Sequence, residues 1–168
     1  MGRELRKVIP NWEHPKVENY DYIKQAYIEE YQPMFDTSYV EAMSEWIKNH
    51  QLWLNGNHPD QIKHPIDTKE YKNYADWAGD APEVKYYRPF LDKDATWFQV
   101  YETVSEGTPI TPPFETKDEL VEWMSNNPDF WGYQWTKKQA INFMGIGCAI
   151  SGVIVNGEFK KWYEVFDK

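Results

Sequence analysis

Residues 96–116 read TWFQVYETVSEGTPITPPFET, a stretch that leads from an expected strand to an expected helix through a connector with three prolines. The alternation of aromatic and β-branched residues over 96–104 predicts the strand. Gly107 lets the chain leave this strand sharply, and the three prolines hold the connector near polyproline geometry. Such a stiff crossover carries the chain to its next element at low entropic cost.

Two helix start signals lie beyond the connector. Thr116 is followed by Glu119 and Thr136 by Gln139, and both pairs fit the capping box, in which the two residues satisfy each other's backbone N–H groups. Apolar residues at helical spacing follow each pair, and Gly145 lies where the second helix should stop. The sequence therefore predicts two helices after the strand.

The last part of the chain contains AISGVIV-NG-EFKKWYEVF. Asn-Gly between two apolar runs is the strongest short signal for a β-hairpin, because a type I′ turn needs positive φ at both turn residues. This turn would place Ile154 opposite Phe159 and Ile150 opposite Tyr163. Residues 97–168 are thus expected to form a β-α-α-β-β module, with a small antiparallel sheet and both helices on one side of it.

The N-terminal part is expected to be mainly helical. After an extended segment over 3–15, residues 20–31 carry Tyr and Ile side chains at helical spacing. A capping box opens a second expected helix over 38–56, and a third, shorter helix is expected over 67–79.

The predicted fold class is therefore α+β. It combines a mainly helical N-terminal part over 1–80, a linking loop over 81–96 and the α+β module over 97–168, either as separate cores or as one domain.

Composition limits the class of protein. The chain has 168 residues, of which 41% are hydrophobic and 17% aromatic, and this is enough for a packed core. A net charge of −9 opposes binding to nucleic-acid backbones and to anionic membranes. The single cysteine, Cys148, excludes an intramolecular disulfide. With no signal-peptide pattern and no apolar run of spanning length, the sequence predicts a soluble intracellular protein.

The histidines do not form a metal-binding motif. His58 and His64 could share a metal ion with Asp60 or Asp67, but neither spacing fits a zinc site. We therefore expect no metal, no cofactor and no catalytic residue of a recognised type.

Glu102 and Glu106 flank the end of the expected strand, with Ser105 between them. A carboxylate pair of this kind suits a hydrolase. The same side chains also commonly hydrogen-bond the backbone of a tight turn, and this interpretation is favoured here.

Aromatic residues gather between the two expected C-terminal helices, in the stretch NNPDFWGYQW (126–135). Aromatic side chains on loops are typical binding anchors. They could equally close one end of a small core, and the sequence leaves both interpretations open. The residues proposed for partner binding are Phe130, Trp131, Tyr133, Trp135, Glu102, Ser105 and Glu106.

The stretch YETVSEGTPITPPFETKDELVEW (101–123) resembles the C-terminal signature of a family of uncharacterised tailed-phage proteins. In that family a strand ending in W/Y-E-T-V-S-E-G is followed by a P-I-S/T-P connector and a helix with E/A-L-x-x-W. GCAISGVIVNG (147–157) resembles a later G-x-A-x-S-x-V/I stretch of the family, with Cys148 where Trp is usual. RKVIPNWEHP (6–15) resembles the family's opening more loosely.

The family carries no assigned activity, so the resemblance implies a phage origin and a shared C-terminal module rather than a mechanism. Longer members carry CxxC pairs that this chain lacks. The positions that match the signature are Tyr101, Glu102, Thr103, Val104, Ser105, Glu106, Gly107, Pro109, Ile110, Pro112 and Trp123.

The leading hypothesis is a phage accessory protein that binds a host or phage protein in the cytoplasm of an infected bacterial host. An anti-defence role, as an inhibitor of a host defence nuclease (anti-CRISPR-like or other), fits the acidity, because an acidic protein can occupy a basic nucleic-acid channel. Direct nucleic-acid or membrane binding is not expected, and a homodimer is left open. The alternatives are a small hydrolase that uses Glu102 and Glu106, and a virion or assembly protein.

Overall fold

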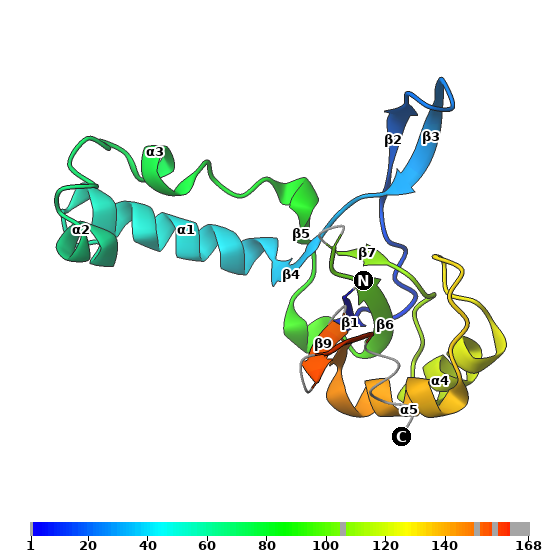
Figure 1. The fold of residues 1–168 in the computed structure, drawn as a ribbon. Helices are drawn as coiled ribbons and strands as arrows, with labels where there is room; N and C mark the ends of the chain where they lie inside the picture. The colour runs from blue at the N-terminus through cyan, green and yellow to red at the C-terminus, as the bar shows by residue number, and fades with distance from the viewer. Residues whose placement is uncertain (1, 105–106, 150–151, 156–157, 162–168) are drawn as a thin grey trace. The chain divides into compact units, whose positions relative to one another are not determined.

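The fold is that of a computed structural model, which describes residues 2–104, 107–149, 152–155 and 158–161, with the backbone alone from residue 149 onward (Figure 1). It is 36% helical and 23% strand, with small antiparallel sheets, so the chain mixes helix and sheet as expected. The strands are β1 (Arg3–Val8), β2 (Lys16–Asp21), β3 (Ala26–Tyr31), β4 (Phe35–Ser38), β5 (Tyr87–Arg88), β6 (Trp97–Glu102), β7 (Thr108–Pro109), β8 (Cys148–Ala149), β9 (Gly152–Val155) and β10 (Glu158–Lys161). The helices are α1 (Tyr39–Leu54), α2 (Pro59–Lys63), α3 (Tyr74–Ala78), α4 (Lys117–Asn126) and α5 (Lys137–Ile146), with short 3-10 turns η1 (Val84–Tyr86) and η2 (Asp92–Asp94).

Two compact units make up the chain. Unit 1 combines the residues up to Asp36 with those from Phe90 onward, and unit 2 spans Thr37–Pro89. Unit 1 is discontinuous because β1, near the N-terminus, pairs along its whole length with β6. This division differs from the continuous division at 81–96 that the sequence suggested.

Unit 1 is built on a four-stranded sheet in the order β7-β6-β1-β8. The antiparallel register of β1 and β6 runs from Arg3 opposite Glu102 to Val8 opposite Trp97. The strand expected over 96–104 is thus confirmed as β6, and the extended N-terminal segment contributes β1. Because successive side chains of a strand point to opposite faces, each face of this pair carries its own set of residues.

Helices α4 and α5 cover one face of the sheet (Figure 1). Both expected capping boxes are present, at Thr116 with Glu119 and at Thr136 with Gln139. Helix α5 continues to Ile146 and ends at Gly147 in the left-handed conformation, two residues beyond the stop expected at Gly145. The helices and the sheet share a buried core made of Val100, Ile110, Leu120, Val121, Met124, Trp135, Ala140, Phe143 and Met144.

The opposite face of the sheet packs against the segments that flank β1 and β6. A second buried cluster forms there from Val8, Phe90, Ala95 and Tyr101, with Trp12 packed against it. Tyr101 therefore lies on the face away from α4 and α5.

The helix expected over 20–31 is wrong. Strands β2 and β3 form a hairpin here, with Tyr20 opposite Tyr27. The Asp21 carboxylate closes the turn by accepting hydrogen bonds from the backbone N–H groups of Ile23 and Lys24. The tyrosine spacing that suggested a helical stripe arises on an exposed hairpin instead.

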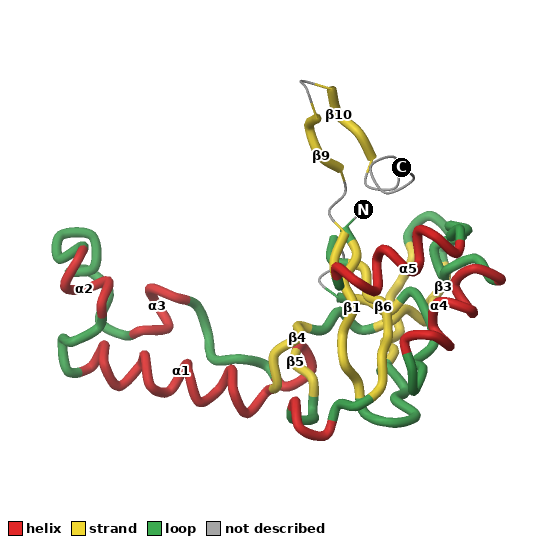
Figure 2. Tube along the Cα trace, turned by 90° about the horizontal axis from the view of Figure 1, so that it is seen from below, coloured by secondary structure: helices red, strands yellow, loops and turns green. Residues whose placement is uncertain are grey.

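A second hairpin lies at the C-terminal end of the described residues, where β9 and β10 pair (Figure 2). Ile154 faces Phe159 in the backbone register, which confirms that part of the prediction. The turn at Asn156-Gly157 and the pair of Ile150 with Tyr163 lie outside the described residues. In the described part of the chain, β9 and β10 form a two-stranded sheet of their own rather than joining β6.

Unit 2 is helical. Helix α1 begins at the expected capping box of Ser38 and Glu41. Helix α2, capped by His58, was not expected, and α3 begins after Asn73, later than the cap predicted at Asp67. Two indole N–H groups make hydrogen bonds within this unit. Nε1 of Trp53 donates to the Tyr71 carbonyl oxygen at 3.3 Å, and Nε1 of Trp77 donates to the Asp60 carboxylate.

In the described part of the chain, no helix has both the length and the apolar character needed to cross a bilayer.

Candidate partner-binding groove

The loop between α4 and α5 is organised by one buried carboxylate, that of Asp129. Its Oδ1 accepts hydrogen bonds from the backbone N–H groups of Trp131 (3.0 Å) and Tyr133 (2.9 Å). Its Oδ2 accepts from Nη2 of Arg3 (3.1 Å) and from Nε1 of Trp135 (3.2 Å). Asp129 thus fixes the loop backbone and ties it to β1.

The Arg3–Asp129 ion pair is buried, and two aromatic rings lie beside the guanidinium. The exposed fraction of the side chain is 5% for Arg3 and 0% for Asp129. The guanidinium carbon lies 5.1 Å from the Tyr133 ring centroid and 5.2 Å from that of Trp135, so two aromatic rings flank the cation. The inner side of the loop is therefore a packed part of unit 1.

The four aromatic residues of the loop divide into two pairs. Trp135 is buried in the helix–sheet core, and Tyr133 is half-buried and packs against that core. Phe130 and Trp131 are 48% and 52% exposed. The core interpretation is confirmed for Trp135, whereas Phe130 and Trp131 keep exposed surface and their role in partner binding stays a prediction.

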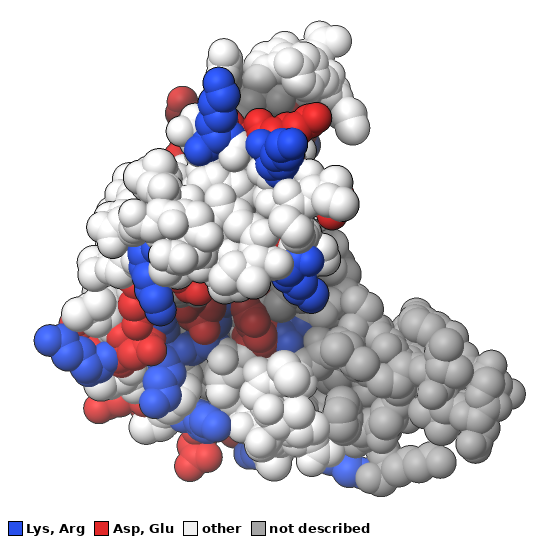
Figure 3. All heavy atoms as spheres, turned by 90° about the vertical axis from the view of Figure 1, so that its left-hand side faces the viewer, with Lys and Arg blue, Asp and Glu red and all other residues white. Residues whose placement is uncertain are grey.

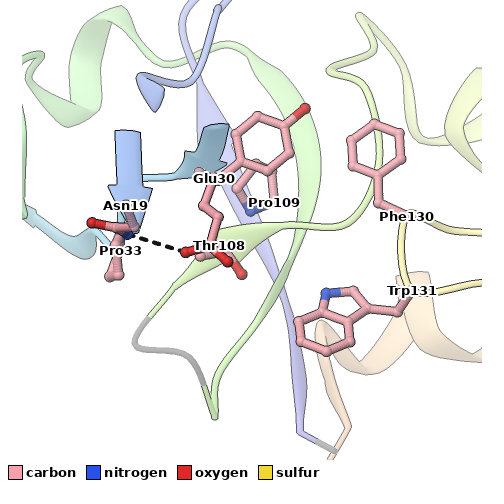
Figure 4. Close-up of a pocket in the computed structure, with 8 residues that line it drawn as sticks. Asn19, Glu30, Pro33, Thr108, Pro109, Phe130 and Trp131 are labelled. Carbon is pink, nitrogen blue, oxygen red and sulfur yellow. Dashed lines mark hydrogen bonds between the residues drawn. The ribbon is translucent and has the colours of Figure 1, made fainter. Parts of the chain in front are cut away.

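Phe130 and Trp131 form one side of a hollow of about 390 Å³, which we call the Trp131 hollow. Figure 4 shows Asn19 and Glu30, from the β2–β3 hairpin, on its other side. Pro109 also lines this hollow. Nδ2 of Asn19 donates to Oε2 of Glu30 at 3.1 Å, which holds the carboxylate at the hairpin edge (Figure 4).

A second hollow, of about 650 Å³, shares two lining residues with the first, and we call it the His14 hollow. Tyr31 and Phe130 line both hollows, and their rings are stacked with centroids 6.0 Å apart and planes 15° apart. The second hollow is also lined by His14, Trp12 and Gln99. We refer to the two hollows together as the aromatic groove.

Three of the residues that line the His14 hollow, Trp12, His14 and Gln99, are held by the hydroxyl of Tyr101. The Tyr101 hydroxyl donates to Oε1 of Gln99 at 2.9 Å and accepts from Nε1 of Trp12 at 3.2 Å. The same hydroxyl lies 3.1 Å from Nδ1 of His14, whose Nε2 lies 2.6 Å from the Gln32 carbonyl oxygen. These contacts fix the positions of the three residues without using any exposed side chain.

Burial sets the protonation of Tyr101 and His14. It raises the pKa of Tyr101 far above the ordinary value of a tyrosine, so the hydroxyl keeps its proton. It also lowers the pKa of His14, an effect that the hydrogen bond with the Gln32 carbonyl opposes and the Arg6 charge reinforces. Tyr101 and His14 are therefore neutral near pH 7.

The charged groups of the groove are mostly acidic. Among the described residues, those that line the two hollows include three carboxylates, Glu13, Glu29 and Glu30, and one ammonium, that of Lys16. Lys16 pairs with Glu29 at 2.8 Å, and this hydrogen bond raises the pKa of Lys16. On the face drawn in Figure 3, Lys and Arg side chains lie among Asp and Glu side chains.

Glu102 lines neither of the two hollows. Glu102 is 2% exposed on β6, and its Oε1 accepts a hydrogen bond from the Val104 N–H at 2.6 Å. This is the turn-stabilising contact that the sequence favoured over catalysis. Ser105 and Glu106 lie outside the described residues.

Two important residues were missed by the sequence analysis. Tyr31 was assigned to a helix, so its place beside the loop could not be seen. Asp129 was not singled out, although an Asp in an Asn/Pro/Gly-rich loop commonly accepts a hydrogen bond from the backbone N–H two residues on.

Within the described residues, no group of three or more His, Cys, Asp or Glu side chains is placed to hold a metal ion. His58 instead caps α2, where its Nδ1 accepts from the Asp60 N–H. No protein-family model, no curated protein and no solved structure matches the chain.

Proposed function

We propose that the protein is a phage accessory protein that works by binding a host or phage protein through the aromatic groove, and that it inhibits a host defence nuclease. The observation that carries the binding role is the pair of half-exposed aromatic side chains, Phe130 and Trp131, on a loop whose backbone is fixed by Asp129. A few residues carry most of the binding free energy at protein interfaces, and tryptophan and tyrosine are enriched among them.

Preorganisation supports this role. A loop that is already ordered loses little conformational entropy on binding, so more of the contact energy appears as affinity. The buried ion pair of Arg3 and Asp129 keeps the loop ordered in the free protein. If the loop only stabilised the fold, Phe130 and Trp131 would be expected to be buried, as Trp135 is.

The nuclease target is favoured by charge, and the phage origin by the resemblance at residues 101–123. A net charge of −9 complements the basic channel of a nucleic-acid enzyme and speeds the encounter. The burial of Glu102 makes a hydrolase based on Glu102 and Glu106 the weaker proposal.

The test is affinity capture of the tagged protein from infected cells, with a Phe130→Ala/Trp131→Ala double variant as the matched control. We expect one stoichiometric host protein with the wild type, and its loss with the variant at unchanged melting temperature. The captured protein should show nuclease activity that falls when the wild type is added back. Equal capture by the variant would overturn the role of the groove, and recovery of phage structural proteins alone would assign the protein to the particle.

A further inference from the structure

We propose that the Trp131 hollow binds an arginine side chain of the partner protein. This inference rests on the proposed binding role of the aromatic groove and names the chemistry of its anchor. The hollow combines one carboxylate, Glu30, with the rings of Tyr31, Phe130 and Trp131. A guanidinium group can use both, because it pairs with a carboxylate in two parallel hydrogen bonds and stacks on aromatic rings.

Among the described residues that line this hollow, Glu30 is the one with a charged side chain. Its contact is a hydrogen bond from Nδ2 of Asn19, which is a neutral donor. The nearby cation Lys16 pairs with Glu29 instead. An apolar anchor in the hollow would shield Glu30 from water without giving it a cation, and an anionic anchor would be repelled. A cation is therefore the ligand that the charges select.

The size and shape of the hollow favour a side chain over a larger ligand. Its volume of about 390 Å³ lies near the lower end of the range for binding pockets, which is roughly 300–1,000 Å³. Arginine suits it better than lysine, because a planar guanidinium is less strongly hydrated and stacks on rings more readily than an ammonium does. The interior of the protein uses the same pairing, with Arg3 beside Trp135 and Arg6 over Tyr101.

The neighbouring carboxylate provides a matched control. Glu29 and Glu30 are adjacent on β3, and both are exposed. Glu29 is paired with Lys16 and lines the His14 hollow, whereas Glu30 lines the Trp131 hollow. Replacing either glutamate by glutamine removes one charge from the same strand, so only the position of the charge differs.

The experiment begins by panning a random peptide library against the wild-type protein, with the Phe130→Ala/Trp131→Ala variant used for counter-selection. We expect the selected peptides to share one arginine. In the best of them, replacing this arginine by citrulline, its neutral isostere, should weaken binding about tenfold or more, and lysine should be intermediate. Glu30→Gln should weaken binding of the arginine peptide to a similar degree, and Glu29→Gln by much less.

The outcomes separate this inference from the proposed function. Peptides that depend on Phe130 and Trp131 but share no arginine would overturn the arginine anchor and leave the binding groove in place. Equal losses for Glu29→Gln and Glu30→Gln would also overturn it, because the effect would then be one of overall charge. If no selected peptide depends on Phe130 and Trp131, both proposals fail.

Discussion

Replacing Asp129 by asparagine should destabilise unit 1 strongly, although the two side chains have nearly the same shape. Four donors converge on this carboxylate: Nη2 of Arg3, Nε1 of Trp135, and the backbone N–H groups of Trp131 and Tyr133. Asparagine offers one oxygen and one NH₂ group, so the oxygen serves two of these donors and the NH₂ group faces the other two.

The magnitude follows from burial. A buried donor left without an acceptor costs about 1–3 kcal/mol, and breaking a buried ion pair by removing one partner costs about 3–5 kcal/mol. These figures describe overlapping losses, so we expect Asp129→Asn to lower the free energy of unfolding by about 3–5 kcal/mol. This is a large part of the roughly 5–15 kcal/mol that stabilises an ordinary domain.

The assay is urea unfolding followed by tryptophan fluorescence, with Asp118→Asn as the control. Asp118 is exposed in the first turn of α4, so its replacement loses only a favourable interaction with the helix dipole, about 0.3–1 kcal/mol. If Asp129→Asn unfolds within about 0.5 kcal/mol of this control, the reasoning about converging donors is wrong.

Three further predictions concern other parts of unit 1. Gly107→Ala should lower the unfolding free energy by about 2 kcal/mol or more, because Gly107 has a φ of +97° and an added Cβ would overlap the Met34 carbonyl oxygen. Thermal unfolding measures this loss, and a change within experimental error would contradict the prediction. Burial lowers the pKa of His14 from its ordinary 6.5, so below pH 6.5 the unfolded chain binds a proton that the folded chain does not. Stability should therefore fall as the pH drops from 6.5 to the lowered pKa and level off below it, and a His14→Gln variant with the same pH slope would refute this. Thr116→Ala should cost about 1 kcal/mol by removing the cap of α4, and Glu115→Ala, one residue outside the box, should cost clearly less in the same unfolding assay.

Three helix caps were predicted correctly from the sequence. The caps at Ser38, Thr116 and Thr136 each depend on a residue only three positions away, so the chain shows them directly. The register of Ile154 with Phe159 follows from the turn type in the same way.

The sequence did not reveal which strands pair with each other. The tyrosines of 20–31 fit a helical period, but the pairing of β2 with β3 and the Asp21 turn decide the structure there. The pairing of β1 with β6 joins segments far apart in the chain, and no local pattern marks it.

Only part of the residues that line the candidate groove could be recognised from the sequence. Phe130 and Trp131 were recognised because loop aromatics are a local signal. Tyr31 and Glu30 were not, because their place beside that loop depends on the hairpin.

The discontinuity of unit 1 has a consequence for synthesis on the ribosome. Strand β1 lies in the middle of its sheet, between β6 and β8, yet roughly 90 residues separate Val8 from Trp97. At about 5–20 residues per second, the nascent β1 waits on the order of 5–20 s for its first neighbour. Unit 2 is contiguous in sequence, so it can fold during this interval. A chain that stops before Trp97 lacks both neighbours of β1, and its unpaired strand would be open to aggregation.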